Sequence, residues 1–114
     1  MKAPGKIELA AIPTLVQQLK FEGKNFLIKR DDFTGMELSG NKVRKLEYIM
    51  YQAKKEKADY IFTCGGEQSN HSRATAIAAV QNGMKPKLFL WGRKSKNPDG
   101  NLFLDNYIGA ETTY

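Results

Sequence analysis

The sequence predicts an α/β fold, with an open, twisted parallel sheet and flanking helices. Three observations lead to this prediction. From residue 41 onward, segments with a helical spacing of apolar residues alternate with short runs of β-branched and aromatic residues, and Gly or Asn separates many of them. This alternation is typical of parallel strands that are joined by helices. The chain has 114 residues, which is the length of one domain.

The first predicted element is a short strand at residues 26–30. Its apolar run, Phe26–Ile28, ends in two basic residues, and the segment 31–35 that follows has the composition of a turn. A helix is predicted from Asn41 to about Lys57, because apolar residues recur there at every third or fourth position between charged ones. These apolar positions are Val43, Leu46, Ile49 or Met50, and Ala53.

Two further pairs of strand and helix follow, and then a last strand begins. Tyr60–Cys64 and Lys87–Trp91 are continuous apolar runs, a pattern typical of strands that are buried on both faces of a parallel sheet. Helices are predicted at 73–81 and 101–108, and the last strand at 111–114. We expect Cys64 to be inert packing and the larger aromatic side chains to lie in the core. These aromatic residues are Tyr48, Tyr60, Phe62, Phe89 and Trp91.

Composition and charge exclude several classes of protein. The chain has 18 Lys and Arg against 12 Asp and Glu, a net charge of +6, but the basic residues are scattered and no nucleic-acid-binding signature accompanies them. No apolar stretch is long enough to span a membrane, and none follows the N-terminus as in a signal peptide. A single cysteine allows no internal disulfide, and no segment resembles a four-ligand zinc site. We therefore predict no nucleic-acid partner, no membrane span, no metal and a cytoplasmic location.

Two loops are candidates for a ligand site, because ligands of parallel sheets bind where strands lead into helix N-termini. In the loop Gly65–His71, paired glycines allow close approach of a ligand, and the next helix directs N–H groups at it. Ser69, Asn70 and His71 add polar groups that suit a small anion such as a carboxylate or phosphate. An equal alternative is that Ser69 only caps the helix and the glycines only turn the chain.

The other loop, Ser39–Lys42, places a lysine at a helix start. A cation is disfavoured at the positive end of a helix, so the neutral amine that Schiff-base chemistry needs is easier to reach at Lys42. Arg44 and Lys45 add positive potential that suits a phosphate. The alternative, which spacing alone favours, is a solvated basic first turn.

Three motifs, in this order, resemble one enzyme family. They are Lys-Arg-Asp-Asp-Phe-Thr-Gly at 29–35, Gly-Asn-Lys-Val-Arg-Lys-Leu-Glu at 40–47 and Gln-Ser-Asn-His at 68–71. The chain is similar, from about residue 13 to 109, to the D-cysteine desulfhydrase and 1-aminocyclopropane-1-carboxylate (ACC) deaminase family. These enzymes use pyridoxal phosphate and have the tryptophan synthase β fold type. The resemblance implies that pyridoxal phosphate is the cofactor.

The resemblance also implies roles for individual residues. Lys42 holds the cofactor covalently and moves the proton at the substrate carbon, with Asn41 beside it and Lys45 at the cofactor phosphate. Asn70 lies beside the ring oxygen of the cofactor, and Ser69 faces the substrate as a proton acceptor or nucleophile. The loop Gln68–His71 binds the substrate carboxylate, although a lone histidine beside a helix cap is more often structural. Three features depart from the family pattern: Ser39, the segment 13–15 without a second proline, and Glu67 with its negative charge.

The resemblance divides the chain and sets expectations for the whole protein. Residues 1–42 form an N-terminal segment that packs on a larger domain, and residues 43–114 form most of the smaller α/β domain. Family members are two to three times longer and form homodimers, so we expect this chain to be a piece of a longer protein and to be inactive alone. The phosphate-binding glycine-rich loop of the family has no match in it.

The activity that the resemblance implies is the breakdown of a small amino acid. D-cysteine desulfhydrase, which forms pyruvate, sulfide and ammonia, is the first expectation because His71 follows Asn70, where bacterial ACC deaminases more often resemble Gln. ACC deaminase, which forms 2-oxobutyrate and ammonia, is the alternative within the family. A non-catalytic anion-binding α/β module is the alternative outside it.

Overall fold

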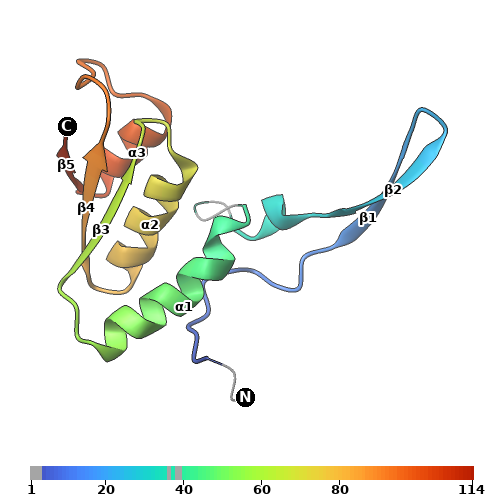
Figure 1. Cartoon of the computed structure of the whole chain (residues 1–114), viewed down its shortest axis with the longest axis horizontal. Helices are drawn as coiled ribbons and strands as arrows, with labels where there is room; N and C mark the ends of the chain where they lie inside the picture. Colours follow the sequence, from blue (N-terminus) through green and yellow to red (C-terminus); the bar gives the residue numbers. More distant parts are fainter. Residues whose placement is uncertain (1–3, 36, 38–39) are drawn as a thin grey trace.

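The structure is a computed structural model that describes residues 4–35, 37 and 40–114. It consists of an α/β unit and a β-hairpin, with helix α1 (Lys42–Lys55) between them (Figure 1). The dimensions are 48 × 42 × 20 Å and the radius of gyration is 16.3 Å, whereas a compact chain of this length has a radius of gyration of about 13 Å. The difference arises because the hairpin extends away from the α/β unit.

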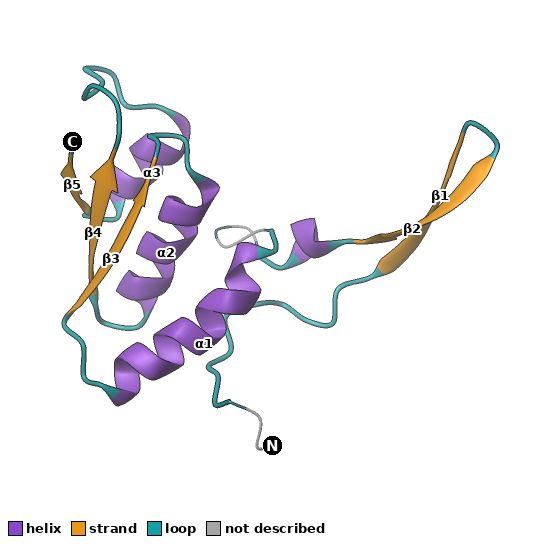
Figure 2. Cartoon of the chain, viewed as in Figure 1, coloured by secondary structure: helices purple, strands orange, loops and turns teal. Residues whose placement is uncertain are grey.

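The α/β unit contains a three-stranded parallel sheet in the order β3-β4-β5, with bounds Tyr60–Gly65, Lys85–Leu90 and Glu111–Thr113 (Figure 2). Tyr60 is in register with Lys85, and Lys87 with Glu111. Helix α2 (Asn70–Gln81) joins β3 to β4, and α3 (Gly100–Tyr107) joins β4 to β5. The parallel α/β sheet that the sequence predicts is therefore confirmed, with element ends within about three residues of their predicted positions.

The core lies between the sheet and the helices. Helix α2 packs on β3 and β4, and α1 and α3 both pack on α2. Small side chains on α2 permit this crowding, since Ala74, Ala76, Ala78 and Ala79 are fully buried on different sides of the helix. The apolar stripe of α1 covers one of these sides through Val43, Leu46, Met50 and Ala53. In the second cluster, Leu88, Leu90 and Leu102 surround Ala76.

The other face of the sheet is exposed in the described chain, so the prediction of strands buried on both faces is wrong here. The side chains of β3 alternate between exposed and partly buried, which is the pattern of a sheet covered on one side. Phe62 is 64% and Trp91 68% exposed, and Cys64 is exposed as well. Tyr48, Tyr60 and Phe89 are also exposed rather than in the core. The physical reason is that Leu88 and Leu90 of the sheet and Leu102 of α3 share the face that α2 covers, which leaves the opposite face without a helix.

The hairpin pairs β1 (Val16–Phe21) with β2 (Lys24–Lys29) in antiparallel register. Its turn residues, Glu22 and Gly23, both have positive φ, as a two-residue type I′ hairpin turn requires. The sequence predicts β2 as the strand at 26–30 but does not predict β1, because β1 has two adjacent glutamines in place of a regular apolar alternation. Apolar side chains are exposed on both faces of the hairpin.

None of the described helices is long and apolar enough to cross a membrane.

Candidate functional site

The two predicted loops come together where α1 and α2 begin. Lys42 is the first residue of α1 and His71 is in the first turn of α2. Burial lowers the pKa of the His71 imidazole below its ordinary value, and the positive charges of Lys45 and Lys42 lower it further. Lys42 and Lys45 are therefore close enough to influence His71 electrostatically. The neutral imidazole is favoured at neutral pH, and its Nδ1 lies 3.5 Å from the Thr75 hydroxyl.

A turn of buried polar groups holds the start of α1. Gly40 has a φ of +98°, a conformation that favours glycine, and its N–H donates to the carbonyl of Asp31 at 3.0 Å. The hydroxyl of Thr34, which is fully buried, lies 2.9 Å from the same carbonyl and 3.0 Å from the carbonyl of Gly40. Asn41 and Lys42, which come next, are exposed. Ser39, which departs from the family pattern, lies outside the described residues.

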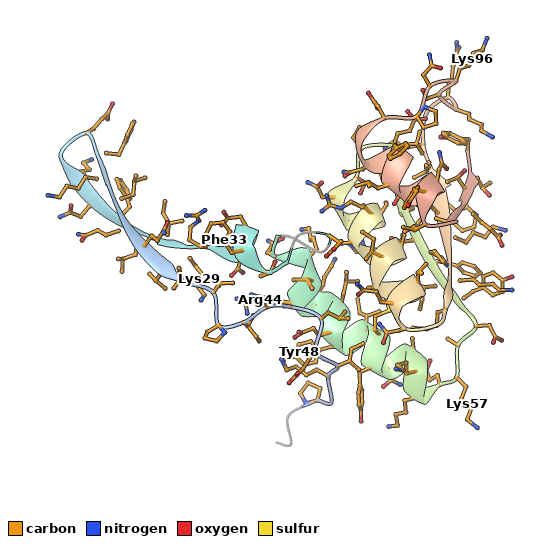
Figure 3. The ribbon with its side chains drawn as sticks, turned by 180° about the vertical axis from the view of Figure 1, so that it is seen from behind. Lys29, Phe33, Arg44, Tyr48, Lys57 and Lys96 are labelled. Carbon is orange, nitrogen blue, oxygen red and sulfur yellow. The ribbon has the colours of Figure 1, made fainter. Side chains whose placement is uncertain are left out.

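An ion pair fastens the same turn to the side of α1. The guanidinium of Arg44 donates to both carboxylate oxygens of Asp31 at 2.8 Å, and the Thr14 hydroxyl donates to one of them at 2.8 Å. These hydrogen bonds, with that of Arg44 the stronger, lower the pKa of Asp31 to about 2. Figure 3 shows Arg44 close to the segment that carries Lys29 and Phe33. The charge of Arg44, expected to suit a phosphate, is thus paired with a carboxylate.

The N-terminal segment is attached further along α1. The carboxylate of Glu47, which is 3% exposed, accepts from the N–H groups of Leu9 and Ala10 at 3.1 Å and from Lys6 Nζ at 3.0 Å. Burial raises the pKa of Glu47, but these hydrogen bonds outweigh burial and the pKa is lower than its ordinary value. The motifs at 29–35 and 40–47 therefore form one structural unit that fixes the start of α1. Both motifs are recognisable in the sequence, but the contacts between them are not.

At the start of α2, Ser69 is the N-cap residue. Its Oγ accepts from the N–H of Ser72 at 3.1 Å, so the capping interpretation is correct. The hydroxyl proton of Ser69 is not used by this bond and can be donated elsewhere. Among the described residues, the N–H groups of Asn70 and His71 have no hydrogen-bond partner, as is usual in the first turn of a helix.

Gly65 lets the helix start approach the strand. A Cβ atom at Gly65 would lie 2.5 Å from Ser72 Oγ and 2.7 Å from Ser69 Cβ, which is closer than real Cβ contacts. The glycine at the end of β3 is therefore required for packing of α2. At Gly66 the nearest atom to an added Cβ is Trp91 Nε1 at 3.4 Å, a tight distance.

The start of α3 holds the loop before α2. The Gln68 amide donates to the Asp99 carboxylate at 2.9 Å and to the Asp99 carbonyl at 3.2 Å, and its oxygen accepts from the N–H of Asn101 at 2.9 Å. The Asn101 amide donates to the carbonyl of Gln68 and to Asn70 Oδ1, both at 2.9 Å. All polar atoms of the Gln68 side chain are thus used by the β4–α3 connection. Asn101 was not among the predicted site residues, because no local sequence pattern marks it.

Glu67 is also held by contacts within the protein. Its carboxylate accepts from the N–H of Ser95 at 3.0 Å and from the Tyr114 hydroxyl at 2.8 Å. Burial, together with the negative charge of Glu67, raises the pKa of Tyr114 to about 12. The carboxylate therefore links the loop before α2 to the loop before α3 and to the residue that follows β5. Within the part of the chain that the structure describes, no group of three or more His, Cys, Asp or Glu could hold a metal.

The geometry brings groups that suit an anion to the starts of α1 and α2. Two exposed lysines of α1, neither of them in an ion pair among the described residues, are close enough to influence His71 in the first turn of α2. The family described as pyridoxal-phosphate dependent enzyme matches residues 2–114. The chain belongs to this family.

Relatives give a more specific comparison. The chain is 50% identical to a putative ACC deaminase of Thermotoga maritima, over 93% of this chain and 35% of that protein. It is 45% identical to a mitochondrial bifunctional D-cysteine desulfhydrase/ACC deaminase of Arabidopsis thaliana, over 90% of this chain and 28% of that protein. It is 37% identical to a D-cysteine desulfhydrase of Salmonella paratyphi A, over 90% of this chain and 31% of that protein. The chain thus spans about a third of the length of these relatives.

A solved structure has the same fold. The crystal structure of an ACC deaminase homologue superposes with a TM-score of 0.85 at 38% identity. The superposition covers 96% of this chain and 34% of that one. The resemblance to the desulfhydrase and deaminase family that the three motifs suggest is therefore confirmed, and with it the α/β fold.

The residues present fit pyridoxal phosphate. The cofactor has an anionic phosphate, a carbonyl that reacts with an amine, and a ring oxygen that accepts hydrogen bonds. Lys42 offers an exposed amine, Lys45 a second cation, and Asn70 an amide whose nitrogen has no partner among the described residues. No carboxylate contacts either lysine among these residues. The donor set therefore suits an anion with an electrophilic carbon.

Proposed function

We propose that this chain contributes the cofactor lysine and the substrate loop of a pyridoxal-phosphate-dependent lyase or deaminase that breaks down a small amino acid. The observation that carries the proposal is the convergence of the α1 and α2 starts, with Lys42 and Lys45 near His71. The bound cofactor would supply an electron sink for the carbon that loses its proton. The residue roles below rest on this convergence together with membership of the family.

On the cofactor side, Lys42 Nζ would form the covalent attachment and hold or move the proton at the substrate carbon. Lys45, one turn further along α1, would contact the phosphate, and Asn41 would lie beside it. Asn70 would contact the ring oxygen through its free amide nitrogen. The turn formed by Asp31, Thr34 and Gly40 supports these roles because it fixes the main chain just before Lys42, and with it the point from which the Lys42 side chain extends.

On the substrate side, the loop Gln68–His71 would bind the carboxylate. The free N–H groups of Asn70 and His71 suit an anion, and the Ser69 proton can be donated while its oxygen caps α2. A neutral His71, favoured by its lowered pKa, can accept a proton. Gln68 would act by shaping the loop, since Asp99 and Asn101 use its side-chain amide.

For the particular reaction, we propose D-cysteine desulfhydrase first and ACC deaminase second. His71 is the feature that favours the first, and relatives of both names support either. We further propose a homodimer in the cytosol, with no nucleic-acid or membrane partner, and the division into a segment 1–42 and a small-domain part 43–114. The α1 start at Lys42 agrees with that boundary.

The test uses the full-length gene product that contains this chain. Borohydride reduction should attach pyridoxal phosphate to Lys42, located by peptide mass spectrometry. Lys42→Ala should abolish release of sulfide from D-cysteine and of 2-oxobutyrate from ACC, because the covalent attachment is lost. Lys55→Ala, at the exposed far end of the same helix, is the matched control and should retain turnover.

Two results would contradict the proposal. Attachment at another lysine would remove Lys42 from its role. Reversible anion binding without turnover of either amino acid would favour the non-catalytic α/β module.

His71→Gln should shift the ratio of sulfide to 2-oxobutyrate production toward 2-oxobutyrate, and an unchanged ratio would show that His71 does not determine the substrate.

A further inference from the structure

A chain of hydrogen bonds runs from α2 through α3 and back to the candidate site. Arg73 Nη1 lies 3.3 Å from Asn101 Oδ1, and Asn101 Nδ2 lies 2.9 Å from Asn70 Oδ1. Arg73 and Asn70 belong to the same helix, three residues apart, and Asn101 belongs to the start of α3. None of the family motifs includes Asn101.

Two independent contacts fix which atom of the Asn101 amide faces which neighbour. A guanidinium can only donate, so the atom that faces Arg73 must be the oxygen of Asn101. A main-chain carbonyl can only accept, so the atom that faces the Gln68 carbonyl must be the nitrogen. The two requirements agree, and they exclude the flipped amide without reference to Asn70.

The orientation of Asn101 then determines that of Asn70. The two hydrogens of Asn101 Nδ2 are donated to the Gln68 carbonyl and to Asn70, so Asn70 must present its oxygen to Asn101. The nitrogen of Asn70, with two hydrogens to donate, is left for another partner. Asn70 is exposed, and among the described residues its nitrogen has no partner.

We propose that Arg73 and Asn101 are positioning residues that hold the Asn70 amide with its nitrogen toward the cofactor, so that Asn70 donates to the ring oxygen and favours its anionic form. This inference rests on the proposed function. It adds to that function two residues outside the three motifs, and it specifies that Asn70 is the donor in the hydrogen bond to the cofactor. An amide free to rotate would present oxygen as readily as nitrogen, and two oxygens that only accept repel each other.

Asn101→Asp is the direct test because it reverses the polarity with little change in shape. The carboxylate cannot donate to Asn70, so the Asn70 amide should rotate, donate to Asp and present its oxygen to the cofactor. A negative charge in the first turn of α3 is favourable for the helix, so the variant should fold. Asn106→Asp, the same change at an exposed position of α3, is the matched control.

The first measurement needs no cofactor. In the full-length apoprotein labelled with ¹⁵N at asparagine, the side-chain amide signal of Asn70 is identified by its loss in Asn70→Asp. In Asn101→Asp, one Asn70 amide proton should move downfield, because it becomes bonded to a carboxylate. Asn106→Asp should leave it in place. An unmoved signal in Asn101→Asp would overturn the inference, and a residue with a merely structural role would not produce the shift.

The second measurement is the dissociation constant of pyridoxal phosphate, followed by its absorbance. Asn101→Asp should weaken binding at least ~10-fold, the scale of one lost hydrogen bond to a charged group. Asn70→Asp should do the same, since both changes remove the donor that faces the ring oxygen. If Asn70→Asp weakens binding and Asn101→Asp does not, the positioning role fails while the proposed function stands. If the unaltered protein does not bind the cofactor, the proposed function fails and the inference with it.

Discussion

At the residue scale, the single hydroxyl of Ser69 can serve two purposes. Its oxygen accepts from the Ser72 N–H, and this bond leaves its proton available to a substrate. The alternatives that the sequence left open, a helix cap or a group that faces the substrate, are thus compatible in one geometry. They can be separated because asparagine is as good a cap as serine but has no hydroxyl.

Ser69→Ala should lower the free energy of unfolding by about 1 kcal/mol through loss of the cap. Ser69→Asn should keep the stability near that of the unaltered protein. If the hydroxyl moves a proton on the substrate, turnover should fall ~100-fold in both variants. Denaturant unfolding and steady-state assays of the full-length enzyme measure the two effects. Near-normal turnover in Ser69→Asn would leave Ser69 as a cap alone.

Asp105 is a buried carboxyl that no motif identified. It is 1% exposed, and its Oδ1 has no hydrogen-bond partner among the described residues. Burial raises its pKa from 3.8 to about 6, with the charge of Arg73 only partly opposing this. The folded state therefore binds the proton more tightly than the unfolded state. The contribution of Asp105 to stability increases as the pH falls from about 6 to 4, and is lost as the pH rises through 6.

Asp105→Asn should remove this contribution to the pH dependence. His71, with a lowered pKa, contributes with the opposite sign on acidification, so the effect of Asp105 is the difference between the variant and the unaltered protein. We expect the thermal midpoint of the apoprotein to be higher in Asp105→Asn at pH 7 to 8, with the advantage shrinking toward pH 4. Asp59→Asn, at an exposed position, is the control. A constant difference across this range would refute the burial argument.

At the scale of elements, the sequence predicted those helices and strands whose apolar residues recur at a regular spacing. Val43, Leu46 and Met50 mark α1 because one side of the helix is buried, and this can be read from spacing alone. The hairpin strand β1 was missed because all six of its residues are exposed, so no buried face imposes an alternation on them. Asn101 and Thr34 were missed for a different reason. Their roles depend on partners that tertiary structure brings together, Gln68 and Gly40 respectively.

Thr34→Val tests whether the turn before α1 is the support of Lys42. The substitution keeps the shape of a fully buried side chain but leaves the carbonyls of Asp31 and Gly40 without its hydroxyl. The free energy of unfolding should fall by about 1–3 kcal/mol, the cost of one buried polar group left unpaired, since the Asp31 carbonyl keeps the Gly40 N–H. Borohydride trapping of the cofactor on Lys42 should become slower. Thr34→Ser, which retains the hydroxyl, should show much smaller effects, and equal effects in the two variants would count against the hydrogen bonds.

At the scale of the whole molecule, the described chain leaves two apolar surfaces uncovered. One is the hairpin, where Leu27 is 77% and Phe21 60% exposed, and the other is the outer face of the sheet with Phe62 and Trp91. Monomeric proteins rarely expose contiguous apolar areas of this kind, because burial stabilises by about 25 cal/mol per Å². Both surfaces belong to elements that the chain shares with relatives about three times its length.

The isolated 114-residue chain should therefore self-associate, bind pyridoxal phosphate weakly and show no turnover of D-cysteine or ACC. A lysine bound to the cofactor is effective only when the phosphate, the ring and the substrate carboxylate are all held in place. The only paired glycines of this chain, Gly65 and Gly66, are already needed for the packing of the loop before α2, so no other glycine-rich segment can bind the phosphate. Sedimentation velocity, cofactor titration and product assays measure the three properties. Leu19→Thr with Phe26→Thr, a cross-strand pair on the hairpin, should reduce self-association without restoring activity. Steady turnover by the purified chain, lost on Lys42→Ala, would show that its own residues complete the site.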